Sequence, residues 1–266
     1  MRCRCWIALR LRENSLAGIR IIPRLDIKGP NLIKGIQLEG FRVVGDPHDF
    51  ALRYYNQGAD ELVFMDIVAS LYQRNNLTEI IKRAADQIYV PITVGGGIRT
   101  LGDVHAMLRS GADKVAINTA AIARPELIRE VSRRFGAQCM VLSVEAKRKD
   151  GGGWEALTDN GREHTGLDVI EWVHQAIALG AGEIMLTSVD REGMRKGFDI
   201  ELLQAVAARV QVPIIASGGY GQPEDLAQAA AAGASGSAIA DALQWRRSTI
   251  LELKVAARRD GLEVRL

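Results

Sequence analysis

Two kinds of segment alternate along the chain from Ile19 onward. Short, nearly continuous apolar runs are followed by longer stretches in which apolar residues recur every three or four positions. Unbroken apolar runs are typical of strands buried on both faces of a parallel sheet, and the wider spacing is typical of amphipathic helices. Eight such runs occur, and they are RIIPRLD, ELVFMDI, VPITVGG, KVAIN, CMVLSVE, EIMLTSV, VPIIASGG and GSAIA.

Eight strand–helix units with no break in composition predict a single domain. The expected fold class is α/β, and the expected architecture is a closed (β/α)8 TIM barrel, which typically takes about 250 residues. The chain has 266 residues, of which 19–266 form the predicted barrel. Residues 1–18 are arginine-rich, and their apolar run is too short for a signal-peptide core. We interpret them as a disordered N-terminal extension.

The chain also repeats itself at a fixed offset. The segment VPITVGGGI at 90–98 matches VPIIASGGY at 212–220, 122 positions later. SGADKVAI and AGASGSAI match at the same offset, as do ELVFMDI and EIMLTSV. Repeated similarity at one offset indicates structural repetition. We therefore expect a barrel built from two duplicated half-barrels.

Composition and charge exclude several classes of function. The net charge of +2 gives no strong bias toward nucleic acid or a membrane surface, and no run of 18 apolar residues is present. The three cysteines, Cys3, Cys5 and Cys139, are an odd number, which argues against a disulfide framework and favours a reducing cytoplasm. We expect a cytoplasmic protein with no nucleic-acid or membrane partner, no metal site and no cofactor.

Polar residues gather where the predicted strands end. Active sites of α/β barrels lie at the C-terminal ends of the strands, so chemistry is expected there. Asp26 and Glu145 end the first and fifth strands, which face each other across a closed barrel. One carboxyl held protonated and one ionised would supply an acid and a base. The alternative is a pair of solvated carboxylates neutralised by Lys28 and Lys147.

Two glycine-rich turns follow the third and seventh predicted strands. They contain Gly95, Gly96 and Gly97, and Ser217, Gly218 and Gly219. Glycine lets the backbone approach an anion closely, and N–H groups at the start of a following helix point toward it. The duplication places the two turns on opposite sides of the barrel mouth. That arrangement suits a substrate with a phosphate at each end.

The beginnings of four predicted strands are charged. Arg20, Glu61, Lys114 and Glu183 open the first, second, fourth and sixth strands. Such residues at the bottom of a barrel usually face solvent. If they turn inward, two cations and two carboxylates can form a closed ionic ring over the barrel axis, since paired charges persist where lone ones cannot.

The segments that carry these residues resemble one family. They are RIIPRLDI, GADELVFMDI, TVGGGI, GADKVAINTAA, RFGAQC, EAKR, TGLD, GAGEIMLTSVDREG, IASGG and a C-terminal VRL. From Ile19 to Leu266 the chain resembles the cyclase subunit of imidazole glycerol phosphate synthase, the HisF family. The resemblance implies that ammonia enters from a glutaminase, of the HisH type, docked on the bottom face. It then reacts with a bis-phosphorylated ribulosyl substrate to give imidazole glycerol phosphate and aminoimidazole carboxamide ribotide in histidine biosynthesis.

The resemblance also implies roles for individual residues. The ring of Arg20, Glu61, Lys114 and Glu183 matches the family's ammonia gate, which the related isomerase of the same pathway lacks. The implied catalytic residues are Asp26, Glu145 and Glu192. The implied phosphate and substrate contacts are Lys34, Gly96, Gly97, Asn118, Thr119, Thr187, Ser217, Gly218 and Gly219.

Several positions depart from the family pattern. Glu145 and Glu192 stand where the family has aspartates, and each longer arm moves the carboxylate by over about 1 Å, a misplacement that can cost roughly 10²-fold in rate. Asp241 replaces a small hydroxyl at the last phosphate grip. Its carboxylate would repel a phosphate, and it can cap the following helix.

Two alternatives to the cyclase follow from these departures. The changes, with MDIVASLYQRNN and SVEAKR, resemble a branch of the family tied to acetamidino modification of surface-polysaccharide sugars, where the barrel delivers ammonia to a nucleotide-sugar route. A non-catalytic barrel that docks a glutaminase and conducts ammonia is the second. The retained Asp26 argues against that second alternative, whereas Glu145 and Asp241 argue for it.

Overall fold

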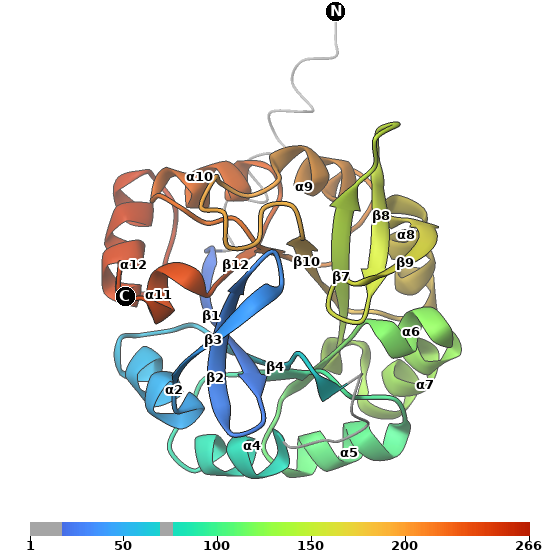
Figure 1. Ribbon diagram of the computed structural model, residues 1–266, viewed down its shortest axis with the longest axis horizontal. Coiled ribbons are helices and arrows are strands. Elements are labelled where there is room, and N and C mark those ends of the chain that lie inside the picture. The colour runs from blue at the N-terminus through green and yellow to red at the C-terminus, as the bar shows by residue number, and fades with distance from the viewer. Residues whose placement is uncertain (1–17, 70–76) are drawn as a thin grey trace, which may run out of the picture.

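Eight parallel strands close into a barrel in the computed structural model, which describes residues 18–69 and 77–266 (Figure 1). The barrel closes because β7 pairs with β10 and β1 pairs with β12. The prediction of a (β/α)8 barrel is therefore confirmed, and each apolar run contributes one strand. In barrel order these are β1 (Arg20–Lys28), β4 (Leu62–Asp66), β5 (Ile92–Gly95), β6 (Lys114–Ile117), β7 (Met140–Arg148), β10 (Glu183–Ser188), β11 (Ile214–Ser217) and β12 (Gly236–Ile239).

Helices surround the barrel as an outer layer (Figure 1). Their ends follow local chemistry. Thr100 and Asp103 form a capping box at the start of α5, and Gly180 ends α8 in the left-handed conformation that glycine favours. The helices are α2 (Pro47–Asn56), α4 (Leu77–Ala85), α5 (Leu101–Arg109), α6 (Thr119–Ala123), α7 (Glu126–Phe135), α8 (Val169–Leu179), α9 (Ile200–Ala207), α10 (Glu224–Ala231), α11 (Asp241–Gln244) and α12 (Ile250–Arg259), with a 3-10 turn at Ala137–Cys139.

Two antiparallel additions extend the barrel strands beyond the expected pattern. The hairpin of β2 (Asn31–Ile36) and β3 (Glu39–Gly45) pairs with the end of β1 and lies across the barrel mouth (Figure 1). The strands β8 (Trp154–Thr158) and β9 (Glu163–Asp168) continue from β7. Neither pair was predicted, because β3 and β9 are largely exposed and so lack an apolar run. Both additions rise on the side where the active site is expected.

The apolar core has two layers. The larger one packs the outer faces of the strands against the helices, and it includes Ile21, Leu25 and Ile27 of β1. A smaller one fills the barrel interior and includes Ile22, Val63, Val141, Met185 and Ile215. Because successive side chains of a strand alternate in direction, Arg20, Arg24 and Asp26 share the inward face of β1 with Ile22.

The matching halves of the sequence occupy opposite positions. β5 and β11, which carry the two glycine turns, lie four strands apart in the closed order, as do β4 and β10. This placement is what two duplicated half-barrels require, and the duplication stays an interpretation of the sequence. Apart from Gly18, the predicted N-terminal extension of residues 1–18 lies outside the described residues. Within the described ranges, no helix is long and apolar enough to cross a membrane.

Candidate active site

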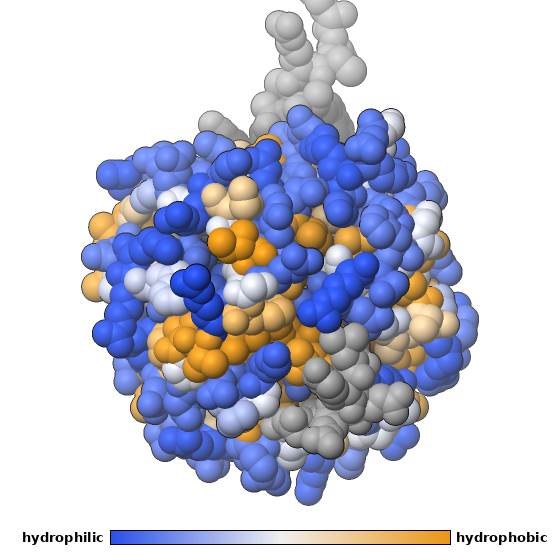
Figure 2. Space-filling model, in the orientation of Figure 1, coloured by the Kyte–Doolittle hydropathy of each residue, from blue (hydrophilic) through white to orange (hydrophobic). Residues whose placement is uncertain are grey.

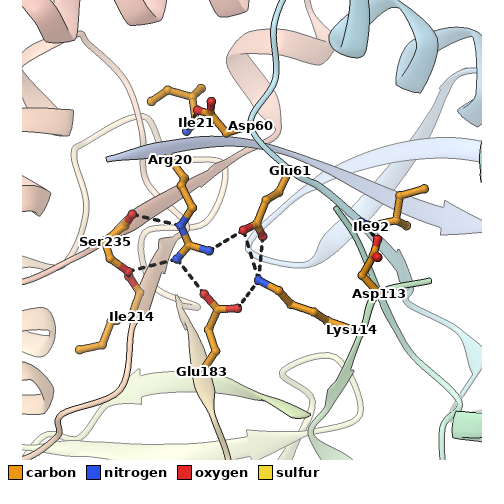
Figure 3. Close-up of polar contacts among 10 residues, drawn as sticks. All are labelled: Arg20, Ile21, Asp60, Glu61, Ile92, Asp113, Lys114, Glu183, Ile214 and Ser235. Carbon is orange, nitrogen blue, oxygen red and sulfur yellow. Dashed lines mark hydrogen bonds and ion pairs between the residues drawn. The ribbon is translucent and has the colours of Figure 1, made fainter. Parts of the chain in front are cut away.

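Four charged side chains close the barrel at the N-terminal ends of its strands (Figure 3). The Arg20 guanidinium donates to Glu61 at 2.6 Å and to Glu183 at 2.7 Å. The Lys114 ammonium donates to Glu61 Oε2 at 3.1 Å and to Glu183 Oε2 at 2.8 Å. Cations and carboxylates therefore alternate around the axis, and the ionic ring expected from the sequence is closed.

The ring is partly buried and is anchored to the barrel wall. Arg20 also donates to the backbone oxygen and the hydroxyl of Ser235, at 3.3 and 3.1 Å. Burial opposes the charge of Arg20, but Glu183 and Glu61 outweigh this effect and raise the pKa of Arg20 above its ordinary value. The apolar interior layer lies beyond the ring, so any path along the axis passes an ionic plug and then an apolar stretch.

At the opposite end of the barrel, Arg24 and Asp26 form a buried ion pair. Arg24 Nε donates to Asp26 Oδ1 at 2.8 Å, and both side chains are 4% exposed. Burial opposes the guanidinium charge, but Asp26 leads the carboxylates that raise the pKa of Arg24. Arg24 Nη1 also donates to the hydroxyls of Thr187 and Ser217, each at 3.2 Å. These two predicted substrate contacts thus accept from Arg24, and each keeps its own O–H group to donate to a ligand.

A second buried ion pair joins the hairpin to the loop after β10. Lys34 of β2 donates to Glu192 Oε1, and their side chains are 3% and 7% exposed. Burial opposes ionisation of Glu192, but the charges of Lys34 and Arg24 outweigh it and lower the pKa of Glu192. The same pairing raises the pKa of Lys34, against its burial. Glu192 is therefore a fixed carboxylate, suited to positioning Lys34 and Arg24 rather than to donating a proton.

Glu145 is held differently from the other two carboxylates. It ends the barrel section of β7, and its Oε2 accepts from Asn118 Nδ2 at 3.0 Å and from Gly161 N at 2.8 Å. Burial raises the pKa of Glu145 to about 7, although the Gly161 N–H and the charge of Arg24 lower it. A carboxyl group that titrates near neutral pH can give and take a proton at working pH.

The structure corrects the alternative of two solvated carboxylates. Asp26 and Glu145 are 3% and 7% exposed, and Asp26 pairs with Arg24 rather than with a lysine. The two carboxyls lie on opposite strands of the barrel and are close enough for the charge of Asp26 to raise the pKa of Glu145. Asp26 is a carboxylate paired with a cation, whereas Glu145 is a carboxyl group that titrates near neutral pH. Two carboxyl groups in such different environments are the arrangement expected of a base and an acid.

A cavity of about 320 Å³ opens at the first glycine turn. Gly96 and Gly97 have φ of 91° and 72°, a region that residues with a side chain rarely adopt. A Cβ at Gly96 would collide with the backbone oxygen of Asp66. The turn therefore needs glycine for its conformation and for its close packing, and it leaves backbone N–H groups beside a cavity wide enough for a phosphate ester.

Asn118 and Thr119 line the same cavity, and the side chains of both have partners within the protein. Asn118 Nδ2 donates to Glu145 and to Leu157 O, both at 3.0 Å. Thr119 Oγ1 accepts from Asp159 N at 3.1 Å. The Asn118 side-chain amide therefore positions Glu145, and the two N–H bonds of that amide are not available to a phosphate.

The second glycine turn is much more filled. Gly218 and Gly219 have φ of 83° and 115°, which are positive like those of Gly96 and Gly97. The space beside them measures only about 20 Å³, with Arg24 and Asp241 in its wall. A Cβ on Gly218 would lie 2.7 Å from Ser188 O and 3.2 Å from Glu192 Oε2. The two glycine turns therefore share a backbone conformation but differ in the volume of the cavity beside them.

Asp241 does not cap helix α11. The N-cap residue is Ala240, without a side-chain cap, and the Asp241 carboxylate accepts from Arg247 Nη1 instead. The ion pair reduces the repulsion that the carboxylate alone would exert on a phosphate.

Arg24 is the functional residue that sequence reasoning missed. Its position was visible in the period of two along β1, which puts Arg20, Arg24 and Asp26 on one face of the strand. Arg24 lies inside β1 rather than at its end, so a prediction based on strand ends did not include it. Asp66 also lines the first cavity, and burial raises its pKa.

Comparison with known proteins places the chain in a family. A family model described as histidine biosynthesis protein matches residues 20–248. The chain is 61% identical over 210 residues to the imidazole glycerol phosphate synthase subunit HisF of Legionella pneumophila, a match that covers 79% of this chain and 99% of that protein. It is 47% identical over 254 residues to the subunit of the same name from Corynebacterium diphtheriae, with 93% and 98% covered.

A third relative agrees with the first two. The HisF subunit of Streptomyces griseus is 48% identical over 248 residues, which span 93% of this chain and 99% of that protein. The barrel, the ionic ring and the carboxyl groups at the barrel mouth are thus found in a chain that matches these subunits over nearly their whole length. The chain belongs to the family of HisF subunits of imidazole glycerol phosphate synthase, the cyclase-type lyases of histidine biosynthesis.

Proposed function

We propose that this protein joins ammonia to a bis-phosphorylated ribulosyl substrate and closes an imidazole ring. The products are imidazole glycerol phosphate and aminoimidazole carboxamide ribotide. The observation that carries the proposal is the arrangement along one axis. A closed ionic ring lies at one end of the barrel, an apolar interior follows, and two unlike carboxyl groups, Asp26 and Glu145, lie at the other end.

A glutaminase of the HisH type is the proposed source of ammonia, docked on the N-terminal face. Ammonia is small and neutral, so an apolar barrel interior does not oppose its passage, whereas ions and bulk water are disfavoured there. The ring of Arg20, Glu61, Lys114 and Glu183 stands at the N-terminal end of this path, where the proposed partner docks. Separation of one ion pair would open the ring without unfolding a strand.

The proposed catalytic roles of the residues at the barrel mouth follow from the surroundings of each side chain. Glu145, whose pKa is about 7, donates a proton to the leaving group during ring closure. Asp26 accepts a proton from the attacking nitrogen through the oxygen that Arg24 does not engage. Glu192 holds Lys34 and with it the hairpin, and its charge also attracts Arg24. Gly96 and Gly97 hold one phosphate through their N–H groups.

The direct test is turnover with ammonia by the purified barrel. Asp26→Asn should abolish product formation while leaving thermal unfolding close to that of the unchanged protein. Glu145→Asp restores the shorter arm and should remain active, which separates loss of the carboxyl from loss of structure. Near-normal turnover by Asp26→Asn would refute the assignment.

A second acceptor for the ammonia is favoured by one observation. The second glycine turn leaves about 20 Å³, with Arg24 and Asp241 in its wall, so it is poorly suited to a second phosphate. This supports the alternative of an acetamidino-sugar modification branch, in which a different substrate would react at the same carboxyl groups. The near-neutral pKa of Glu145 argues against the non-catalytic barrel. We propose a cytoplasmic location for either activity, since the described cysteine, Cys139, is a buried free thiol.

A further inference from the structure

A basic cavity lies beside the barrel mouth, between the β2–β3 hairpin and the segment around α11. Its volume is about 470 Å³, larger than the cavity at either glycine turn and within the range of small-molecule sites. Figure 2 shows that this face of the molecule is mainly hydrophilic, with an apolar strip across its middle. The walls come from β2, β3, the loop after β10 and the residues at and after α11.

Cationic side chains dominate the wall. Lys34, Arg42, Arg195 and Arg247 line the cavity, against the carboxylates of Glu39 and Asp241. Lys34 is neutralised by Glu192, and Arg247 by Asp241.

Two of the guanidinium groups have no partner within the part of the chain that the structure describes. Among the described residues, the side chains of Arg42 and Arg195 form no hydrogen bond and no ion pair. Guanidinium groups bind phosphate oxygens through two parallel N–H bonds, and unpaired ones at a cavity wall are available for this. Arg195 has a φ of 55°, a conformation costly for a residue with a side chain and one that recurs at ligand sites.

An aromatic side chain completes the wall. Trp245 lines the cavity and is 41% exposed, whereas Trp154 and Trp172 are 9% and 2% exposed. An accessible indole next to cations offers a flat face on which a nucleobase can stack. Glu39 is exposed on the same wall, and a carboxylate is the group that commonly accepts from ribose hydroxyls.

We propose that this cavity binds a nucleoside diphosphate. The Trp245 indole stacks on the base, Glu39 accepts from the ribose, and Arg42 and Arg195 bind the diphosphate. A group attached to the terminal phosphate would extend past Lys34 and Gly193 toward Glu192. The site goes beyond the proposed cyclase reaction, whose substrate carries single phosphates at its ends.

Calorimetric titration of ADP and UDP into the purified full chain tests the proposal without any cyclase substrate. Both should bind, because stacking tolerates different bases. AMP, UMP and inorganic pyrophosphate should each bind at least about tenfold more weakly, since each lacks one guanidinium contact or the stacked base. Equal binding of the monophosphates would overturn the diphosphate assignment, and equal binding of pyrophosphate would overturn the base contact. No binding of ADP or UDP would overturn the site.

Substitutions locate the binding. Arg42→Gln, Arg195→Asn and Trp245→Ala should each weaken ADP binding by about tenfold or more, whereas Trp245→Phe should retain it. Asparagine is chosen at 195 because it tolerates positive φ. Arg258→Gln is the matched control, because Arg258 is exposed on α12 and does not line the cavity.

Two readouts keep the result separate from the cyclase assignment. Each variant should keep the thermal unfolding temperature and the ammonia-dependent turnover of the unchanged protein. Weakening by Arg258→Gln equal to that by Arg42→Gln would show general attraction to basic protein and overturn the site. Loss of cyclase activity in Asp26→Asn with ADP binding intact would separate the two proposals.

Discussion

Arg24 and Asp26, two residues apart on β1, form an ion pair inside the barrel at 2.8 Å with each side chain only 4% exposed. The pair places a cation beside the second glycine turn, where Arg24 also donates to the hydroxyl of Ser217. Any substrate that reaches the second turn meets the wall that contains this guanidinium. The carboxylate proposed as the base is therefore positioned by a charge that the strand itself supplies.

The Arg24–Asp26 pair should reveal itself in stability. Arg24→Met leaves the Asp26 carboxylate buried without its cation, and breaking a buried pair typically costs about 3–5 kcal/mol of unfolding free energy. The double variant Arg24→Met/Asp26→Leu should recover most of this loss, because an apolar pair needs no partner charge. Urea unfolding measures all three proteins.

The exposed pair of Lys82 and Glu79 provides the control for that experiment. Its side chains are 54% and 82% exposed, so Lys82→Met should change stability by less than about 1 kcal/mol. Equal stabilities for Arg24→Met and the unchanged protein would contradict the view that Asp26 is charged and dependent on Arg24.

Glu145 predicts a pH dependence of stability. Its pKa rises from 4.5 to about 7 on folding, so the folded state holds a proton that the unfolded state has lost between those values. The stability from this proton is complete below about pH 4.5 and is lost as the pH rises to about 7, a change of about 3 kcal/mol. Glu145→Gln does not titrate and should lack this decline. Parallel decline in both proteins between pH 4.5 and 7 would assign the effect to other groups.

Glu145 also predicts a pH dependence of turnover. As an acid it must be protonated, so kcat/KM should fall as the pH rises through about 7. The measurement holds the concentration of free ammonia constant at each pH, because ammonia itself titrates. A kcat/KM that rises through the same range would make Glu145 the base and exchange its role with that of Asp26.

Substitution in the ionic ring should uncouple the two reactions. Lys114→Met leaves Glu61 and Glu183 sharing only Arg20, and carboxylates about 4 Å apart repel by about 1 kcal/mol in water and several times more in a partly dry site. With a bound glutaminase, less product should form per glutamine hydrolysed. Turnover with free ammonia should be unchanged, since Lys114 lies at the other end of the barrel. Full coupling in Lys114→Met would refute the gate.

The charge of Asp241 should make the second glycine turn bind phosphate more weakly than the first. A carboxylate beside the second glycine turn opposes a phosphate, and the repulsion of about 1 kcal/mol or more is comparable to one charge-assisted hydrogen bond. Asp241→Ser removes the charge and releases Arg247, so it should tighten binding of the bis-phosphorylated cyclase substrate by about tenfold. Calorimetry with both proteins decides this. Tight binding by the unchanged protein, with no gain in Asp241→Ser, would favour the histidine-pathway substrate over the sugar-modification alternative.

Local patterns were enough to predict the barrel, its strand ends and its ring. Apolar runs mark strands buried on both faces, and a parallel barrel collects all C-terminal ends on one side, so the sequence alone placed Asp26 and Glu145 at the barrel mouth. The same reasoning placed Arg20, Glu61 and Lys114 at the other end. These predictions need only the alternation of side chains along a strand and the direction of the chain.

The partners of the polar groups were decided by tertiary structure alone. Arg24 bonds to Thr187 and Ser217, which lie 163 and 193 residues away in the chain, and this contact exists only because the barrel closes. The choice of Asn118 to bind Glu145, and of Arg247 to bind Asp241, likewise depends on side-chain directions in loops. A charge in a buried site takes whichever partner the fold brings within hydrogen-bond distance, because leaving it unpaired is costly. The sequence by itself determined where the charges lie, and the closed barrel decided which of them are neutralised and which remain for a ligand.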